Sequence, residues 1–199
     1  VKMNPETLNT DEKFRLSVVI PTINSEKFIL KNVEKLEYFL KNSEEIKDYE
    51  IIISSQTSHD STFKVLRNIR SDKIQVLFLK EKGKGVGLTA GFKEAKYAWV
   101  LMMDDDLPYP FESIKKLFEK ISHYDIIIAS RYIQKLDNKS PWIRRFASNV
   151  YLRLVKTLTN IPQKDIQAGM KLIKKKVFEK TGYPKNQGYV WDTEMLYLA

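Results

Sequence analysis

The sequence contains no cysteine and only two histidines. Without cysteine, disulfide bonds and thiolate metal sites are excluded for these 199 residues, and we do not expect a zinc site. Long apolar segments are also absent. No run reaches the roughly 18 to 20 residues of a membrane-spanning helix, and the first residues lack the apolar core of a secretion signal. We therefore expect a soluble, cytoplasmic chain.

Acidic residues are scarce between positions 131 and 185. This segment has 14 lysines and arginines but three acidic residues, a net charge of +11, whereas the rest of the chain has 20 basic and 22 acidic residues, a net charge of −2. Such asymmetry indicates an anionic partner: a nucleic acid, a membrane surface or a phosphorylated substrate. Neither zinc-finger spacing nor an RNA-binding aromatic motif accompanies the charge, so we expect no nucleic acid partner.

Short apolar segments alternate with amphipathic ones along the chain, in which hydrophobic residues form 43% of the total. We predict strands at residues 16–20, 51–53, 74–79, 98–103, 125–129 and 169–173, and helices at residues 26–40, 62–69, 88–95, 111–121, 142–159 and 192–199. Continuous apolarity in the strands is typical of a parallel sheet covered on both faces. The predicted fold class is α/β, with a Rossmann-like, mostly parallel sheet flanked by helices in one domain.

Polar residues follow four of the predicted strands. They are Pro21-Thr22, Ser54 to Gln56, Asp104 to Asp106, and Ser130-Arg131. In open α/β sheets, ligands bind beyond the carboxyl ends of the strands. We therefore expect these four segments to meet at one crevice.

Three consecutive aspartates, Asp104, Asp105 and Asp106, follow the apolar segment 98–103. Clustered carboxylates cost free energy unless a cation or several hydrogen-bond donors satisfy them. In an extended segment the first and third carboxylates lie on the same side and can reach one ion, and Mg²⁺ prefers such oxygen ligands. The pattern predicts a metal site. One aspartate could instead cap the helix predicted to begin at Phe111.

Seven segments of the chain form a recognisable series: Leu16–Asn24, Gly83–Gly91, Val100–Pro110, Ala129–Tyr132, Arg144–Ser148, Asp165–Met170 and Trp191–Leu196. Taken in this order, they resemble those of family 2 glycosyltransferases, in particular the dolichol-phosphate mannose synthase type of polyprenyl-phosphate glycosyltransferase. The resemblance implies a GT-A fold, a nucleotide-sugar donor, a divalent cation, Mg²⁺ or Mn²⁺, and inversion at the anomeric carbon.

The resemblance also divides the chain. Residues 1–15 are expected to be an N-terminal extension and residues 16–199 the catalytic domain. Within it, the donor half covers about residues 16–130 and the acceptor half about residues 131–199. The last predicted helix stops inside an apolar pattern without a C-cap, so we expect the domain to be incomplete at its C-terminus.

For the donor, the resemblance implies that Asp104 and Asp106 hold the cation on the diphosphate, with Asp106 catalytic and Asp105 a spacer. The cation would act as a Lewis acid on the leaving nucleotide. The glycine-rich segment from Gly83 has an alternative interpretation as a flexible turn before a helix. The expected donor contacts are Pro21, Thr22, Asn24, Gln56, Lys84, Gly85, Asp104 and Asp105.

Two positions depart from the family pattern. Ser55-Gln56 stands where relatives have an Asp-Asp pair that contacts the base and ribose, so base selectivity is not inferred, although Gln56 could hydrogen-bond a base. Pro108 stands where the mannose synthases offer a glutamine to the metal. The protein would then supply two carboxylates to the cation, with weaker affinity or with help from Asp105.

The acceptor expected from the resemblance is a polyprenyl phosphate, held by Arg131, Arg144, Arg145 and Ser148. A planar guanidinium can bind two phosphate oxygens at once, and Arg131 is also assigned a catalytic role. The phosphate oxygen is already anionic and needs no general base. The basic segment would add attraction to an anionic membrane surface, so we expect peripheral contact with the cytoplasmic face.

Four alternatives stay open. A sugar hydroxyl acceptor would need a general base, for which Glu194 is the candidate and Asp165 and Asp192 are reserves. The chain could be a catalytically silent nucleotide-sugar-binding module. A haloacid-dehalogenase-type phosphatase or a nucleotidylyltransferase is less favoured, because the former places its aspartates after the first strand and the latter has an arginine-containing glycine-rich loop there.

Overall fold

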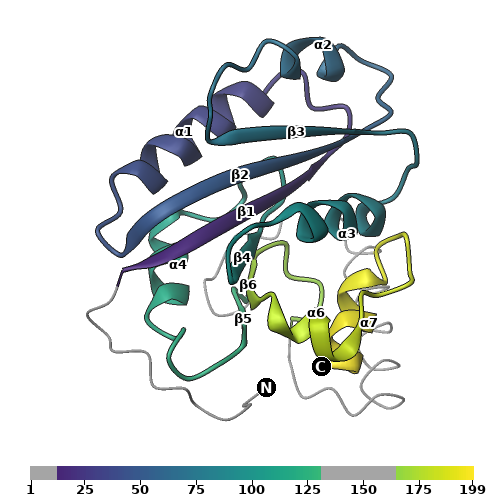
Figure 1. Cartoon of the computed structure of the whole chain (residues 1–199). Coiled ribbons are helices and arrows are strands. Elements are labelled where there is room, and N and C mark those ends of the chain that lie inside the picture. Colours follow the sequence, from purple (N-terminus) through teal and green to yellow (C-terminus); the bar gives the residue numbers. More distant parts are fainter. Residues whose placement is uncertain (1–12, 131–164) are drawn as a thin grey trace, which may run out of the picture.

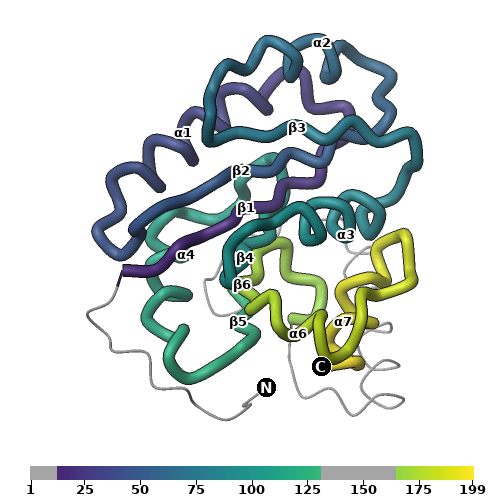
Figure 2. Tube along the Cα trace, viewed as in Figure 1, coloured from purple at the N-terminus to yellow at the C-terminus, as the bar shows by residue number. Residues whose placement is uncertain are grey.

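The computed structural model describes residues 13–130 and 165–199. Six strands form one sheet in the order β3-β2-β1-β4-β6-β5. They are β1 (Phe14–Thr22), β2 (Ile46–Gln56), β3 (Ile74–Leu79), β4 (Trp99–Met102), β5 (Ile126–Ile128) and β6 (Lys171–Lys174). All pairings among β1 to β4 are parallel, whereas β6 is antiparallel to both β4 and β5. Figure 2 shows the trace of this sheet, and the predicted mostly parallel α/β architecture is confirmed.

The strand order reverses between β1 and β4. The chain builds outward from β1 to β2 and β3, then returns to place β4 on the other side of β1. Ligands of such folds bind in the crevice at the carboxyl ends of the two strands that flank this point. Because β6 is antiparallel, its first residues rather than its last lie at the same edge.

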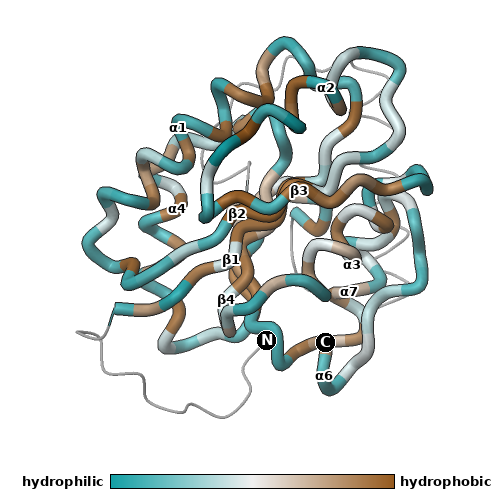
Figure 3. The backbone as a smooth tube through the Cα atoms, turned by 45° about the horizontal axis from the view of Figure 1, so that its top comes forward, coloured by the Kyte–Doolittle hydropathy of each residue, from teal (hydrophilic) through white to brown (hydrophobic). Residues whose placement is uncertain are grey.

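In the described part of the chain, six helices cover the sheet. They are α1 (Ile29–Lys41), α2 (Thr62–Leu66), α3 (Lys84–Glu94), α4 (Phe111–Phe118), α6 (Lys176–Thr181) and α7 (Trp191–Leu198). Helices α1, α2 and α4 pack on one face with Val18 of β1, and α3, α6 and α7 pack on the other with Val19, because successive strand residues point to opposite faces. Figure 1 shows α3, α6 and α7 gathered together, and Figure 3 shows the apolar strands in the centre.

Helices α3 and α6 differ from the sequence prediction. Helix α3 begins at Lys84, four residues before the predicted start, so Gly85 and Gly87 belong to the helix rather than to a loop. A Cβ on Gly85 would lie 2.3 Å from the carbonyl oxygen of Asn186, which explains why glycine occurs inside a helix here. Helix α6 was not predicted, because six residues are too few to show a helical period. The helix predicted at 142–159 lies outside the described residues.

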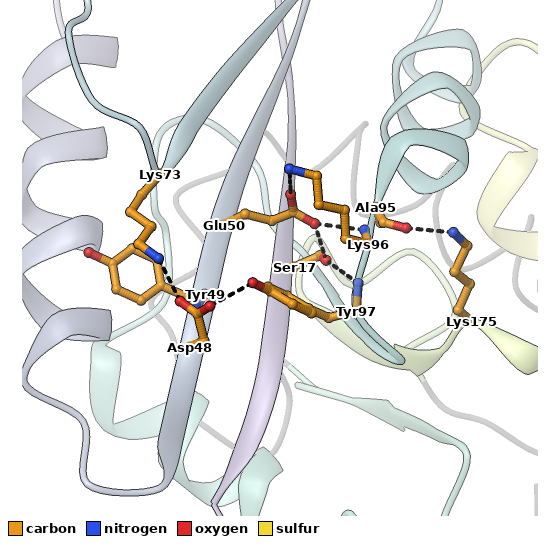
Figure 4. A network of polar contacts seen from close by, with 9 residues as sticks. All are labelled: Ser17, Asp48, Tyr49, Glu50, Lys73, Ala95, Lys96, Tyr97 and Lys175. Carbon is orange, nitrogen blue, oxygen red and sulfur yellow. Dashed lines mark hydrogen bonds and ion pairs between the residues drawn. The ribbon is translucent and has the colours of Figure 1, made fainter.

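A polar network joins the first halves of β1 and β2, away from the carboxyl ends (Figure 4). The Asp48 carboxylate accepts hydrogen bonds from the Tyr97 hydroxyl at 2.8 Å and from Lys73 Nζ at 2.7 Å. The Glu50 carboxylate accepts one from the buried Ser17 hydroxyl at 2.7 Å. The network ties the segment between α3 and β4 to β1 and β2.

Across the described part of the chain, no helix has both the length and the apolarity that crossing a bilayer requires.

Candidate active site

The three aspartates lie directly after β4, and the carboxylates of the first two have different partners. Asp104 Oδ1 is 2.7 Å from Lys84 Nζ in an ion pair. Asp105 Oδ2 accepts hydrogen bonds from the hydroxyls of Thr22, at 2.5 Å, and of Ser25. Asp105, expected to be a spacer, therefore joins the end of β4 to the end of β1 at the point where the strand order reverses.

Asp106 is the exposed member of the three. Partial desolvation raises the pKa of its carboxyl group, and the neighbouring charges of Asp104 and Asp105 raise it further. Leu107 follows with a left-handed φ of 47°, so the chain turns sharply before Pro108. Three carboxyl groups in sequence crowd negative charge here, which is the condition under which a bound cation stabilises carboxylates.

Gly169, just before β6, leaves room for Asp104. A Cβ at this position would lie 1.9 Å from Asp104 Oδ2, so any other residue would displace the carboxylate. The backbone N–H of Gly169 donates to the Tyr109 hydroxyl at 3.2 Å, in a buried hydrogen bond that holds this backbone in place. Sequence reasoning did not single out Gly169, because its contact lies 65 positions away along the chain.

The backbone on either side of Lys84 is fixed by two contacts. The Gln56 side chain accepts a hydrogen bond from the Gly83 N–H at 2.6 Å. The Gln187 carbonyl accepts from the N–H groups of Gly85, at 2.9 Å, and of Val86, at 3.3 Å. Gln56 is 4% exposed, and its amide oxygen is used to hold the start of α3. This contact gives the Gln56 oxygen a structural partner, and contact of Gln56 with a nucleotide base stays a prediction.

The segments after β1 and β2 are also joined. Asn24 adopts a left-handed φ of 54°. Its N–H donates to the Ser58 hydroxyl at 3.1 Å, and its side-chain oxygen accepts from the His59 N–H at 2.8 Å. The predicted donor residues Pro21, Thr22 and Asn24 thus belong to one edge of the sheet, where Thr22 contacts Asp105 and Asn24 braces the neighbouring loop.

Asp104 and Asp106 suit Mg²⁺ or Mn²⁺, which bind hard oxygen ligands. Within the described ranges, no group of three or more histidine, cysteine, aspartate or glutamate side chains converges on a possible metal site. The space that Gly169 leaves for Asp104 fits a carboxylate ligand at this position. We therefore infer that these two carboxylates are the residues that would hold the cation.

A buried ion pair lies next to this edge. Lys171 Nζ is 2.5 Å from Asp192 Oδ1 and donates to the Ala168 carbonyl at 2.7 Å, with the two charged side chains 0% and 3% exposed. Burial lowers the pKa of Lys171, and the Asp192 carboxylate opposes this change. The pair joins the start of β6 to the first turn of α7. No sequence pattern indicates this pair, because its two residues are 21 positions apart and belong to different elements.

Glu194, the candidate general base, holds a loop. Its two carboxylate oxygens accept hydrogen bonds from the backbone N–H groups of Lys185, at 2.9 Å, and Asn186, at 2.8 Å. This loop carries Gln187, whose carbonyl contacts the start of α3. The reserve candidates have other surroundings: Asp192 pairs with Lys171, and Asp165 is buried at 3% exposure.

The expected phosphate-binding residues Arg131, Arg144, Arg145 and Ser148 lie outside the described residues. Several lysines of the basic segment are described, and they contact the protein itself. Lys174 and Lys176 lie 3.2 and 3.5 Å from Asp125, and Lys175 donates to the Ala95 carbonyl at 2.5 Å. Part of the positive charge of residues 131–185 is therefore paired within the protein.

Comparison with known sequences finds a matching family and individual relatives. Residues 17–182 match the family described as Glycosyl transferase family 2. The dolichol-phosphate mannosyltransferase of Pyrococcus furiosus is 36% identical over 140 residues, covering 67% of this chain and 38% of that protein. The dolichyl-phosphate beta-glucosyltransferase of Mus musculus is 28% identical, covering 93% of this chain and 63% of that protein. The chain spans only part of the length of both relatives.

Comparison with solved structures supports the fold. The glucosyl-3-phosphoglycerate synthase of Mycobacterium tuberculosis, crystallised with Mn²⁺, UDP-glucose and phosphoglyceric acid, matches with a TM-score of 0.64. The two sequences are 14% identical, and the match covers 92% of this chain and 64% of that chain. At this identity the likeness concerns the fold alone, and it confirms the predicted GT-A architecture.

Proposed function

The chain belongs to glycosyl transferase family 2, and from this premise we propose that it transfers a sugar from a nucleotide diphosphate donor to a polyprenyl phosphate. The observation that carries the proposal is the placement of Asp104, Asp105 and Asp106 after β4, where the strand order reverses and Lys84 faces Asp104. Carboxylates and an ammonium group at such a crevice suit a cation and a diphosphate. We further propose that the sugar is transferred with inversion.

The donor site is proposed at the carboxyl ends of β1, β2 and β4. A divalent cation held by Asp104 and Asp106 would supply Lewis-acid stabilisation of the leaving diphosphate. Asp105 keeps the ends of β1 and β4 together through Thr22 and Ser25, which fixes where the two outer carboxylates lie. Lys84, on the first turn of α3, provides a positive charge on the same side.

The proposed acceptor rests on the relatives, whose names specify dolichol phosphates, and on the chemistry of the candidate base. A phosphate acceptor requires cationic groups to position it and no group to take a proton. Glu194 is engaged by two backbone N–H groups, which suits a supporting role. Arg131, Arg144, Arg145 and Ser148 are proposed to bind this phosphate. Contact with the cytoplasmic face of a membrane is part of the same proposal.

A donor screen tests the proposal. UDP, GDP and TDP sugars are added with Mn²⁺, and the melting temperature is followed, since a ligand of the native state raises it by mass action. One nucleotide class should raise the melting temperature, and the Asp106→Asn variant should lose this Mn²⁺-assisted shift. The apo variant should melt no lower than the wild type, because one crowded negative charge has been removed.

Turnover then separates the candidate functions. Sugar should pass from the selected donor to a polyprenyl phosphate. Binding without transfer to any acceptor would favour the silent binding module, and transfer to a sugar hydroxyl alone would favour the branch that uses Glu194 as a base. Unchanged affinity of Asp106→Asn for both Mn²⁺ and nucleotide would show that the metal assignment is wrong.

A further inference from the structure

The ion pair between Lys84 and Asp104 holds two charges that the proposed reaction needs for other partners. Lys84 Nζ lies 2.7 Å from Asp104 Oδ1, and the side chains are 16% and 34% exposed. Lys84 therefore already neutralises the first carboxylate of the metal pair.

A divalent cation cannot simply be added beside this pair. Like charges a few ångströms apart repel strongly at a partly desolvated site. The second oxygen of Asp104 faces the backbone at Gly169, where even one methyl group would not fit, so it has little room to turn. Asp105 is occupied by Thr22 and Ser25. A cation arriving alone would therefore meet Asp106 and an Asp104 that Lys84 already holds.

The main chain around Lys84 stays fixed while its side chain is long and flexible. Gln56 holds the N–H of Gly83, and the Gln187 carbonyl holds that of Gly85. The ammonium group can therefore change partners without any movement of α3. A diphosphate offers it new anionic oxygens, whereas a free metal ion offers none.

We propose that Lys84 is an exchangeable counter-ion, which neutralises Asp104 while the donor site is empty and passes to the donor diphosphate when the metal–nucleotide complex binds. The cation and the nucleotide then enter together, and free cation binds poorly because it competes with Lys84. The second half of this inference rests on the proposed donor, whereas the competition for Asp104 does not.

The test compares Lys84→Met with Lys82→Met by calorimetry. Lys82 lies two positions earlier and contacts His59 at 3.5 Å, so its variant removes the same charge from the same segment but leaves the ion pair intact. With Mn²⁺ alone, Lys84→Met should bind about tenfold or more tightly than the wild type, the size of effect that one close opposite charge has on a carboxylate. Lys82→Met should match the wild type.

The second arm uses UDP and GDP with saturating Mn²⁺. Lys84→Met should bind the accepted nucleotide about tenfold or more weakly, because a charge-assisted contact to the diphosphate is lost. Lys84→Arg, which keeps the charge, should restore weak binding of free Mn²⁺, and Lys84→Gln serves if the methionine variant fails to fold.

Equal Mn²⁺ affinity in the wild type and in the folded neutral variant would overturn the competition for Asp104. Tighter Mn²⁺ binding with unchanged nucleotide affinity would overturn the exchange. If neither nucleotide binds to the wild type or to any variant, the proposed donor is wrong, and the Mn²⁺ arm still decides whether Lys84 occupies the cation's place.

Discussion

At the scale of single residues, the space around Asp104 depends on the missing side chain of Gly169. A Cβ there would lie 1.9 Å from Asp104 Oδ2, and the contact is with a side chain that Lys84 holds from the other side. We expect Gly169→Ala to displace the carboxylate and to weaken Mn²⁺-dependent nucleotide binding about tenfold or more, with a stability cost of about 1 to 3 kcal/mol from overpacking.

The matched control for this prediction is Gly188→Ala. A Cβ on Gly188 would have its nearest neighbour at 3.5 Å, an ordinary contact with Asn186 Oδ1. Nucleotide binding by calorimetry and unfolding in urea should therefore be close to the wild type for this variant. A Gly169→Ala protein with normal affinity would show that Asp104 need not keep the position seen here.

The residue-scale contacts also show what the sequence could reveal. Asp104 and Asp106 were predicted from the sequence because they are two positions apart and follow an apolar strand. The contacts of Asp104 with Lys84 and Gly169 were not predicted, because these residues are 20 and 65 positions away from it in the chain. Lys84 was expected to contact the donor on resemblance alone, and its contact with Asp104 required the fold.

At the scale of elements, Asp48 fastens the start of β2 to its neighbours. Hydrogen bonds from Lys73 and Tyr97 lower its pKa from 3.8 to about 2 (Figure 4). A carboxyl group with a lowered folded-state pKa stabilises the fold above its unfolded-state pKa, and the stabilisation disappears as the pH falls from about 4 to about 2. Asp48 is 36% exposed, so solvent screening keeps the effect at about 1 kcal/mol or less.

Urea unfolding at several pH values checks this. Asp48→Asn should be less stable than the wild type at pH 7, and the difference should shrink toward zero as the pH approaches 2. Tyr97→Phe, which removes the hydroxyl donor to Asp48 but keeps the ring, should show a smaller loss with the same pH dependence. A difference that persists unchanged at low pH would mean that packing, rather than the charge of Asp48, is responsible.

Glu194, on helix α7, could hold the preceding loop or act as a general base, and kinetics can separate these two roles. Glu194→Gln keeps one acceptor oxygen but cannot accept both backbone N–H groups of Lys185 and Asn186. With a phosphate acceptor, we expect most of kcat to remain and the KM for the donor to rise, because the loop that holds the start of α3 is loosened. With a hydroxyl acceptor, loss of a general base should lower kcat about a hundredfold or more.

The pH profile of the wild type supplies a check on the same question. A phosphate acceptor predicts activity that rises through the second phosphate ionisation near pH ~6 and then stays level. A hundredfold fall in kcat for Glu194→Gln, with normal donor affinity and an intact fold, would contradict the lipid-phosphate acceptor and assign Glu194 as the base.

At the scale of the whole molecule, the pattern of apolar segments predicted the α/β class and the mostly parallel sheet. It could not predict that β6 is antiparallel, because periodicity reports burial and not strand direction. The convergence of strand ends was inferred from the general behaviour of parallel sheets, and Asp105 with Thr22 now provides a direct contact across that edge. The buried pair of Lys171 and Asp192 exists only once β6 and α7 are packed together.

In the whole molecule, we expect the donor and the acceptor to be bound by different parts of the chain. The carboxylates and Lys84 proposed for the donor belong to residues 16–130, whereas the arginines proposed for the acceptor belong to residues 131–199. Arg131→Lys keeps the charge but loses the planar guanidinium that can bind two phosphate oxygens. We therefore expect transfer to a polyprenyl phosphate to fall about tenfold or more, while nucleotide binding stays at the wild-type value.

Arg15→Lys, at an exposed position at the start of β1, is the control and should change neither measurement. An equal loss of nucleotide affinity in Arg131→Lys would place Arg131 on the donor diphosphate, and the division of the chain into donor and acceptor halves would then be wrong.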